Sequence, residues 1–256
     1  GNAGPLAAAL AYTFAPFHLV NLYVRGDSLA ELWAMALTPL ALWSVEHLRA
    51  RLSFGRAAAL AGLVGGLICT HNVSALMALP FVGLYAALRL GDTRTGRWRR
   101  WGVAGLGLAW GLAASAFFWA PALGEVGAVQ LAALTNGYFS YTGHFRSLDL
   151  VQTALTFDYA SHPFAVGLVQ ALFGVAGLIA RLLRRERWGA SDAFVLLGVI
   201  ISTLLITPWS EPLYAGLPGL AYVQFPWRFL GIQALFTAAL SGWLWPMTGA
   251  TEVGRP

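Results

Sequence analysis

The sequence contains no lysine and only one cysteine, and it carries few charges of either sign. Charged residues make up 11% of its 256 residues, whereas a typical soluble domain contains about 25%. So few charges cannot cover the surface of a soluble domain of this length, and 58% of the residues are hydrophobic. The composition therefore predicts an integral membrane protein. It argues against a soluble enzyme, a nucleic-acid-binding protein and a small secreted domain held by disulfides.

The chain begins at Gly1 without a methionine or a signal-peptide charge pattern, and an apolar run follows almost at once. We expect it to be a fragment of a longer protein, with residues 1–250 forming one transmembrane domain. Cys69 has no second cysteine to pair with, which excludes a disulfide framework and a cysteine-based metal site.

Apolar segments along the chain have about the length that a membrane helix needs, which is roughly 20 residues. We predict an all-α polytopic bundle of about eight transmembrane helices. The stretch between Arg56 and Arg89 is too long for one span and short for two, and a hairpin of two helices is favoured because it keeps the flanking arginines on one side. The predicted spans are residues 5–24, 28–47, 57–71, 73–89, 101–123, 163–181, 191–208 and 228–247.

The arginines are unevenly distributed between the two sides of this topology. Arg25, Arg146 and Arg228 lie on one side, and the positive-inside rule places the other, arginine-rich side in the cytoplasm. We therefore expect a multi-pass protein of the inner or plasma membrane, with both ends of this fragment in the cytoplasm. The predicted cytoplasmic arginines are Arg49, Arg51, Arg56, Arg89, Arg94, Arg97, Arg99, Arg100, Arg181, Arg184, Arg185 and Arg187.

Two longer segments, 124–162 and 209–227, connect the predicted spans on the outer side. Both contain many aromatic residues, which is typical of segments at the membrane interface. Apolar residues at helical spacing between Phe145 and Phe157 predict a short amphipathic helix, and hence juxtamembrane helices on the extracytoplasmic face. A packing loop without chemistry is the alternative.

The first polar motif, YVRGDSLAE, lies between the first two predicted spans. Ser28 and Glu31 have the spacing of a capping box, and Asp27 and Glu31 also suit the positive end of a helix. This structural interpretation does not include Arg25. A functional interpretation makes Arg25 a phosphate-binding cation beside carboxylates at the outer membrane face.

The second polar motif, THNVS, lies at the tip of the predicted hairpin. Polar groups such as His71 and Asn72 are costly near the hydrocarbon region unless they are paired, and they often mark function. The alternative is a turn in which backbone carbonyls satisfy both side chains.

The third polar motif, QFPWRFL, places Arg228 at the start of the last predicted span, on the side with few arginines. A guanidinium matches the geometry of a lipid phosphate or pyrophosphate, which would be its natural partner there. The alternative is an ordinary interface anchor for the last helix. The glycine pairs at 62 and 66 and at 107 and 111 indicate close helix packing rather than function.

The motifs YVRGDSLAE, THNVSAL, HFRSLDLVQ and QFPWRFL, in this order, resemble a bacterial and archaeal family of membrane proteins described as related to 6-pyruvoyl-tetrahydropterin synthase. The resemblance extends from about Leu6 to about Leu240. The sequence lacks the histidine cluster of the soluble pterin enzyme, so pterin chemistry is not expected. The family looks like the GT-C membrane glycosyltransferases, which use polyprenyl-phosphate sugars on the extracytoplasmic face.

The resemblance implies a GT-C-like fold and a cell-envelope enzyme that transfers a hexosyl or pentosyl group from a polyprenyl-phosphate sugar. Its partners would be membrane lipid and that sugar donor, with no nucleic acid. Asp27, Glu31 and His71 would be the catalytic residues. The residues that would bind the substrate are Arg25, Asn72, His144 and Arg228.

Two points remain open within this hypothesis. GT-C enzymes usually carry a catalytic carboxylate in their first outer loop, and that loop would precede Gly1, so the catalytic base can lie upstream. No metal site is predicted and the cofactor is unknown, although a divalent Mg²⁺ or Mn²⁺ ion could bridge a carboxylate and the phosphate. The alternatives to an enzyme are a flippase or exporter of lipid-linked saccharides and a non-catalytic membrane assembly protein.

Overall fold

The structure is a computed structural model, and it confirms the predicted all-α class: it is 77% helical and contains no strand among the residues described. A single isolated bridge joins Val151 and Val166. The described residues are 2–26, 28–91, 96–128, 135–147, 149–184 and 186–245.

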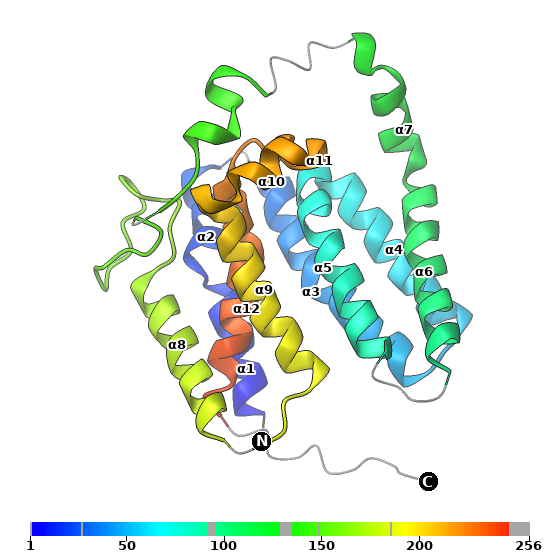
Figure 1. Cartoon of the computed structure of the whole chain (residues 1–256), viewed down its shortest axis with the longest axis horizontal. Coiled ribbons are helices and arrows are strands. Elements are labelled where there is room, and N and C mark those ends of the chain that lie inside the picture. Colours follow the sequence, from blue (N-terminus) through cyan, green and yellow to red (C-terminus); the bar gives the residue numbers. More distant parts are fainter. Residues whose placement is uncertain are drawn as a thin grey trace.

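The main helices run alternately upward and downward in the view of Figure 1, and they lie where the sequence predicts its apolar segments. They are α1 (Ala3–Thr13), extended by α2 (Pro16–Leu19) and the π-helix η1 (Val20–Val24), α3 (Leu29–Ala50), α4 (Phe54–Thr70), α5 (Asn72–Gly91), α6 (Arg97–Ala114), extended by α7 (Ala116–Gly124), α8 (Leu168–Leu183), α9 (Ala190–Ile206) and α12 (Leu230–Gly242). Only His71 separates α4 from α5, so the stretch between Arg56 and Arg89 forms two helices.

Short helices gather at the upper end of Figure 1, around the turn at His71. The lower end carries the C-termini of α3, α5 and α8. The short elements are η2 (Val126–Ala128), η4 (Gly137–Phe139), η5 (Tyr141–Gly143), η6 (Pro208–Ser210), α10 (Glu211–Gly216), α11 (Pro218–Ala221) and η7 (Pro226–Phe229).

The prediction of an amphipathic helix between Phe145 and Phe157 is wrong. The described part of this segment is irregular, because its backbone pairs with distant segments instead of with itself. The amide of Val166 donates to the carbonyl of Leu150, and the amide of Gln152 donates to the carbonyl of Val166. These bonds satisfy the polar backbone groups that a helix would otherwise satisfy locally.

Two helical segments are long and apolar enough to cross a membrane, namely Ala3–Val24 and Asn72–Gly91. Two further pairs qualify only if each bent pair is one span: α6 with α7, bent by 63°, and α9 with Pro208–Gly216, bent by 89°. The described residues thus hold two to four candidate spans, and the prediction of about eight is not confirmed. One reason is length, since at 1.5 Å per residue α8 and α12 are shorter than the roughly 30 Å hydrocarbon layer.

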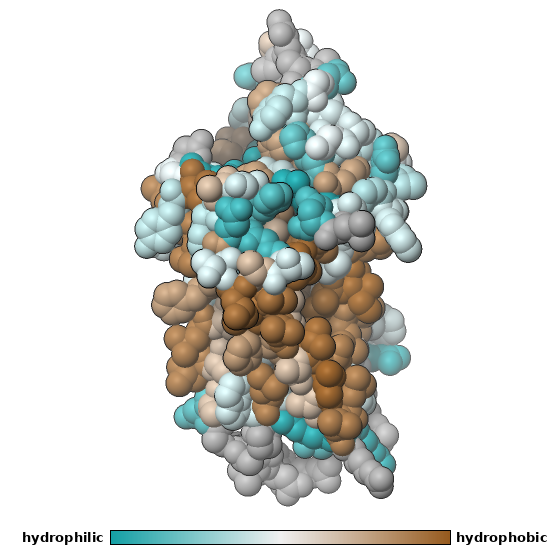
Figure 2. Space-filling model, turned by 90° about the vertical axis from the view of Figure 1, so that its left-hand side faces the viewer, coloured by the Kyte–Doolittle hydropathy of each residue, from teal (hydrophilic) through white to brown (hydrophobic). Residues whose placement is uncertain are grey.

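The surface of the bundle is that of a membrane protein. On the face shown in Figure 2 a hydrophobic belt crosses the middle of the molecule, with hydrophilic groups above and below it. Large apolar side chains point outward, as in Trp33 (67% exposed), Leu106 (69%) and Phe117 (75%). Apolar patches of this extent favour contact with lipid rather than with water.

The described arginines divide between the two ends of the bundle as the sequence predicts. Only Arg25, Arg146 and Arg228 lie at the upper end among the described residues. The described arginines of the lower end are Arg49, Arg51, Arg56, Arg89, Arg97, Arg99, Arg100, Arg181, Arg184 and Arg187.

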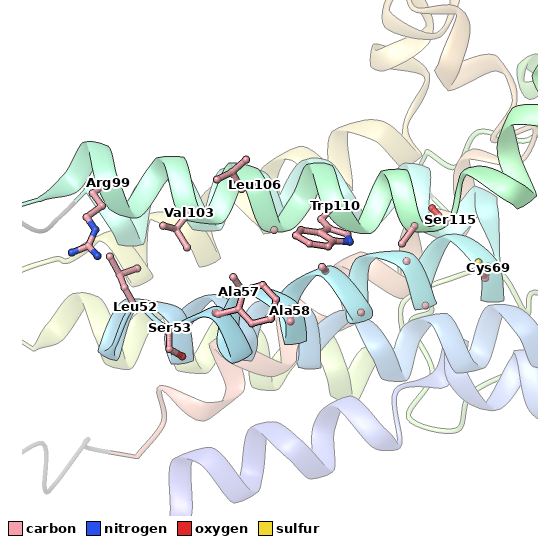
Figure 3. Close-up of a pocket in the computed structure, with 17 residues that line it drawn as sticks. Leu52, Ser53, Ala57, Ala58, Cys69, Arg99, Val103, Leu106, Trp110 and Ser115 are labelled. Atoms are coloured by element: carbon pink, nitrogen blue, oxygen red, sulfur yellow. The ribbon is translucent and has the colours of Figure 1, made fainter.

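Helices α4 and α6 pack against each other through glycine, as Figure 3 shows. A Cβ atom on Gly107 would lie 3.2 Å from the carbonyl oxygen of Ala57, and one on Gly111 would lie 2.6 Å from that of Ala61. The predicted packing role of the α6 pair is therefore confirmed. Gly62 on α4 differs, because a Cβ there would meet no atom within 4 Å.

Candidate functional site

Three predicted residues from distant parts of the chain meet at the upper end of the bundle. Nη1 of Arg25 donates to Oε2 of Glu31 at 2.6 Å, and Nε of Arg228 lies 4.0 Å from the same oxygen. The side chain of Glu31 is 1% exposed, and those of Arg25 and Arg228 are 17% and 12% exposed. Two guanidinium groups thus share one buried carboxylate.

A break in the first helix places Arg25. Ala15 is extended because it precedes Pro16, and the chain resumes as a short helix that widens into the π-helix η1. Asn21 in η1 is fully buried, and its Oδ1 accepts a second bond from Nη1 of Arg25 at 2.5 Å. Gly26, with a φ of +41°, then turns the chain toward α3.

Glu31 does not form the predicted capping box. The side chain of Ser28 makes no capping hydrogen bond to α3, and the carboxylate of Glu31 binds Arg25 instead of the helix N-terminus. A buried carboxylate needs a charged partner, whereas a helix end near the surface can bond to water. Asp27, the other acidic candidate of this motif, lies outside the described residues.

Arg228 is held by an unusual backbone turn. Gln224 has a φ of +63°, the one positive φ of a non-glycine residue in the described chain. This conformation is unfavourable for a side chain with a Cβ and often occurs at functional sites. The carbonyl of Val223, the residue directly before Gln224, accepts a bond from Nη1 of Arg228 at 3.0 Å.

Two polar atoms of the cluster lack hydrogen-bond partners among the described residues. They are Oε1 of Glu31 and Nε of Arg228, and both are buried. A small cavity of about 10 Å³ adjoins Arg228, which is room for about one water molecule. It is lined by Tyr12, Met35, Thr38, Ser74, Met77, Arg228, Gly231 and Ile232.

His71 reaches this cavity through Ser74. Its Nδ1 accepts the amide of Ser74 at 3.1 Å and lies 2.8 Å from the hydroxyl oxygen of the same residue. The neutral ring therefore carries its proton on Nε2. In the turn outside both helices, burial lowers the pKa of His71; the charge of Glu31 raises it, and those of Arg228 and Arg25 lower it further.

The other two predicted binding residues lie outside this cluster. The side chain of Asn72, the first residue of α5, is exposed, and its Oδ1 accepts a hydrogen bond from the amide of Val73. His144 lies one ring away: its imidazole is 4.6 Å from the ring of Phe225, and the guanidinium of Arg228 lies 4.9 Å from that same ring.

Sequence reasoning missed the aromatic residues that cover the cluster. Arg25 lies 5.1 Å from the ring of Trp227, and Trp227 stacks on Phe164 at 3.8 Å and on Phe225 at 5.1 Å. Arginine over an aromatic face is attracted by the ring quadrupole. The motif QFPWRFL therefore supplies one arginine and the rings that cover both, and their position beside Arg228 in the sequence was an available signal.

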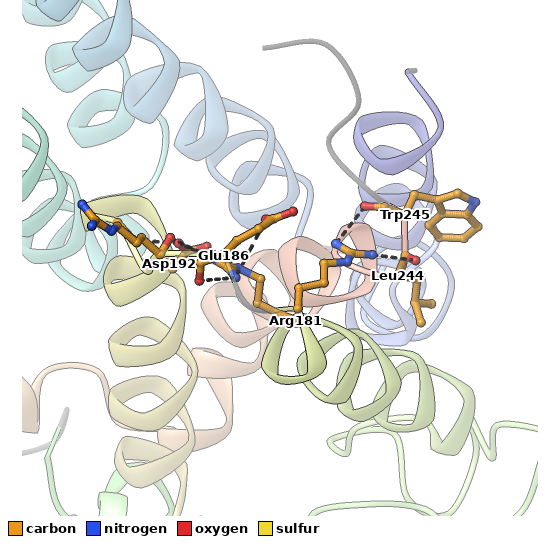
Figure 4. Close-up of polar contacts among 8 residues, drawn as sticks. Arg181, Glu186, Asp192, Leu244 and Trp245 are labelled. Atoms are coloured by element: carbon orange, nitrogen blue, oxygen red, sulfur yellow. Dashed lines mark hydrogen bonds and ion pairs between the residues drawn. The ribbon is translucent and has the colours of Figure 1, made fainter. Parts of the chain in front are cut away.

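Charged clusters at the lower end are better satisfied. Figure 4 shows Arg181, whose Nη2 donates to Asp192 Oδ2 at 2.9 Å and whose Nε donates to Oδ1 at 3.3 Å. Arg184 donates to the carbonyl oxygens of Leu244 and Trp245, which ties α8 to the end of α12. These contacts complete the hydrogen bonding at the ends of helices, as expected of structural groups.

The comparison with known proteins concerns nearly the whole chain and not only the cluster. Residues 2–248 match the family described as "6-pyruvoyl-tetrahydropterin synthase related domain; membrane protein". The chain belongs to this family. No curated protein and no solved structure matches it. The Arg25–Glu31–Arg228 cluster lies within the matched region of this membrane family.

The residues of the cluster do not form a metal site. No three His, Cys, Asp or Glu side chains come close enough to hold a metal ion within the part of the chain that the structure describes. Glu31 is the one carboxylate of the described cluster, and its Oε2 is engaged by Arg25. A divalent cation therefore does not fit the described donor set.

Proposed function

We propose that this protein is part of an integral-membrane glycosyltransferase that uses a polyprenyl-phosphate-linked sugar at the extracytoplasmic face, with a GT-C-like fold. The observation that carries the proposal is the Arg25–Glu31–Arg228 cluster. Two cations against one carboxylate leave excess positive charge in a poorly hydrated site, and a phosphate would compensate it.

The two arginines have different parts in this proposal. Arg25 is already bonded to Glu31 and Asn21, whereas the Nε of Arg228 has no hydrogen-bond partner among the described residues. Arg228 is thus the cation with hydrogen-bonding capacity left for a ligand. It would stabilise the polyprenyl phosphate that leaves when its bond to the anomeric carbon breaks.

A base completes the reaction. The hydroxyl oxygen of the acceptor would form the new bond to the anomeric carbon while its proton passes to a carboxylate. Oε1 of Glu31 is the available carboxylate oxygen in the described cluster. Asp27 or a carboxylate upstream of Gly1 is the alternative base, and His71 would donate from Nε2 to the substrate. No step is assigned to a metal.

The binding step is tested with Arg228→Gln in the full chain, reconstituted in nanodiscs and titrated with polyprenyl phosphate. A charge-assisted contact contributes about 1.5–3 kcal/mol, so we expect affinity to fall roughly ten- to hundredfold. The matched control is Arg146→Gln, because Arg146 is at the same end of the bundle and also has a buried Nε without a hydrogen-bond partner among the described residues, but it pairs with Asp149 and not with Glu31. Equal affinity of both variants and the wild type would refute the phosphate site.

The orientation is tested by cysteine labelling in a Cys69→Ser background. The arginine distribution favours an extracytoplasmic upper end and a cytoplasmic lower end. A cysteine at Gly143 should then react with an impermeant thiol reagent in intact cells, and one at Ser53 should not. The reverse pattern would place the cluster in the cytoplasm and contradict the proposal.

One observation favours transport of lipid-linked saccharides as a second candidate function. Arg25 already engages Oε2 of Glu31, and a flippase needs the cations but no base. The two functions differ in product. Release of free polyprenyl phosphate from a labelled sugar donor indicates transfer, and movement of the intact donor between leaflets indicates transport.

A further inference from the structure

A groove of about 720 Å³ follows α4 and α6. In Figure 3 it follows both helices, from Leu52 and Arg99 at the lower end to Cys69 and Ser115 at the upper end. This volume lies within the range of about 300–1,000 Å³ that is usual for ligand sites. No residue of the Arg25–Glu31–Arg228 cluster lines the groove, and Arg99 lies at the end of the groove that is farther from the turn at His71.

The groove exists because its α4 wall is built from residues with little or no side chain. Ala58 and Gly62 line it, and the open space above Gly62 would admit a side chain without a clash. Phe54 and Trp110 approach each other with ring centroids 6.2 Å apart and line the same groove. Its walls are therefore apolar and suited to a hydrocarbon chain.

The lower end of the groove is strongly basic. Arg99 lines it, and this exposed side chain makes no hydrogen bond or ion pair with any described residue. The neighbouring Arg56 and Arg100 donate to backbone carbonyls and so remain uncompensated positive charges. The nearby acid Glu46 is already paired with Arg49 and Arg89.

We propose that this groove binds one anionic membrane phospholipid, with a hydrocarbon chain along α4 and α6 and its phosphate at Arg99. Two observations fit this occupant: an apolar channel along α4 and α6, and unpaired positive charge at one end of it. Basic pockets between membrane helices are known to bind anionic headgroups in this way, because a desolvated phosphate gains from a guanidinium.

Four variants of the full chain test the proposal. Gly62→Leu fills the channel, and its matched control Gly105→Leu adds the same side chain in open space on α6, outside the groove. Arg99→Gln removes the charge, and its matched control Arg97→Gln removes an exposed arginine that lies over the ring of Trp98 instead. Native mass spectrometry measures binding of phosphatidylglycerol and of phosphatidylcholine to each purified protein.

The expected results distinguish the contribution of the lipid's hydrocarbon chain from that of its headgroup. Wild type should prefer phosphatidylglycerol, Arg99→Gln should lose this preference with an affinity about tenfold lower, and Gly62→Leu should bind both lipids more weakly. Both controls should match the wild type. Unchanged lipid binding in Gly62→Leu and Arg99→Gln would overturn the proposal. A change in oligomeric state in Gly62→Leu without a change in lipid binding would show that a protein helix occupies the groove.

Discussion

The two ends of the bundle use the same kinds of charged side chains with different results. At the lower end, Glu46 is 27% exposed, and both of its oxygens are bonded: Oε1 to Arg89 and Tyr85, and Oε2 to Arg49 and Arg89. At the upper end, Glu31 is 1% exposed and one of its oxygens has no hydrogen-bond partner among the described residues.

This difference indicates which cluster stabilises helix packing and which is the better candidate to bind a ligand. A fully bonded cluster rigidifies the ends of helices, whereas a half-satisfied buried cluster is unfavourable unless another group completes it. The lower clusters therefore tie α3 to α5 and α8 to α9, and the upper cluster is the better candidate for function. Substitutions at both ends test this contrast.

Glu31→Gln should have the largest effect on stability. The change leaves Arg25 and Arg228 facing each other without their shared counter-charge, and breaking a buried ion pair costs about 3–5 kcal/mol. The free energy of unfolding, measured by denaturant titration in detergent, should fall by about that amount. A loss below about 1 kcal/mol, the usual value for a surface pair, would show that Glu31 is hydrated and that the contrast between the ends is false.

Arg181→Gln should have the second-largest effect. The side chain of Arg181 is 6% exposed and donates to both oxygens of Asp192, and a hydrogen bond to a charged group contributes about 1.5–3 kcal/mol. Asp192 keeps the bond from the amide of Gly189, so the loss should stay at about 2 kcal/mol. The same titration measures it, and affinity for polyprenyl phosphate should not change. A loss of that affinity would contradict a purely structural role.

Glu46→Gln should have a smaller effect. Glu46 itself is 27% exposed and its partner Arg49 is 37% exposed, so water can reach the pair when the carboxylate is removed, and the loss should be about 1 kcal/mol or less. High salt should reduce the difference between variant and wild type, because exposed charges are screened. If Glu46→Gln lowers the free energy of unfolding as much as Glu31→Gln does, the two carboxylates contribute equally to stability and the contrast between the ends is wrong.

The pH dependence between 7.5 and 5.5 should show the smallest effect, through His71 at the upper end. Burial lowers the pKa of His71 below its ordinary value of 6.5, so the unfolded chain takes up this proton at a higher pH than the folded chain. The stability that the neutral ring provides is present above pH 6.5 and is lost as the pH falls toward the lower folded pKa. Thermal unfolding of His71→Gln should therefore depend less on pH between 7.5 and 5.5 than that of the wild type. If the two proteins show the same dependence of thermal unfolding on pH, the ring of His71 is hydrated in the folded state.

The positions of the helices could be predicted from the sequence, because apolar runs end at polar or helix-breaking residues. The bends could not. Ser115 lies where α6 meets α7, and its hydroxyl bonds to the carbonyls of Gly111 and Leu112, which is a known cause of helix bending. The irregular segment after Phe145 was also missed, since it depends on pairing with the distant Val166.

The candidate site was predictable in part. Arg25 and Arg228 stood out because they are cations on the side where arginine is scarce, and the structure brings both to Glu31. The assignment of Glu31 to a capping box was wrong, since spacing alone cannot show whether a carboxylate is buried. The strained backbone of Gln224 has no signal in the sequence, because its conformation is imposed by the surrounding fold.

The aromatic cover of the cluster has a consequence for how often the site is open. The cavity beside Arg228 admits about one water, so a phosphate needs more room, and movement of Phe225, whose ring lies 4.9 Å from the guanidinium of Arg228, would provide it. Aromatic pairs contribute about 0.5–1.5 kcal/mol each, and Phe225 alone contacts the rings of Tyr138, Phe139 and His144. Separating three such pairs leaves an open population on the order of one per cent. A ligand that selects this minority binds with an apparent affinity about a hundredfold weaker than its affinity for the open form.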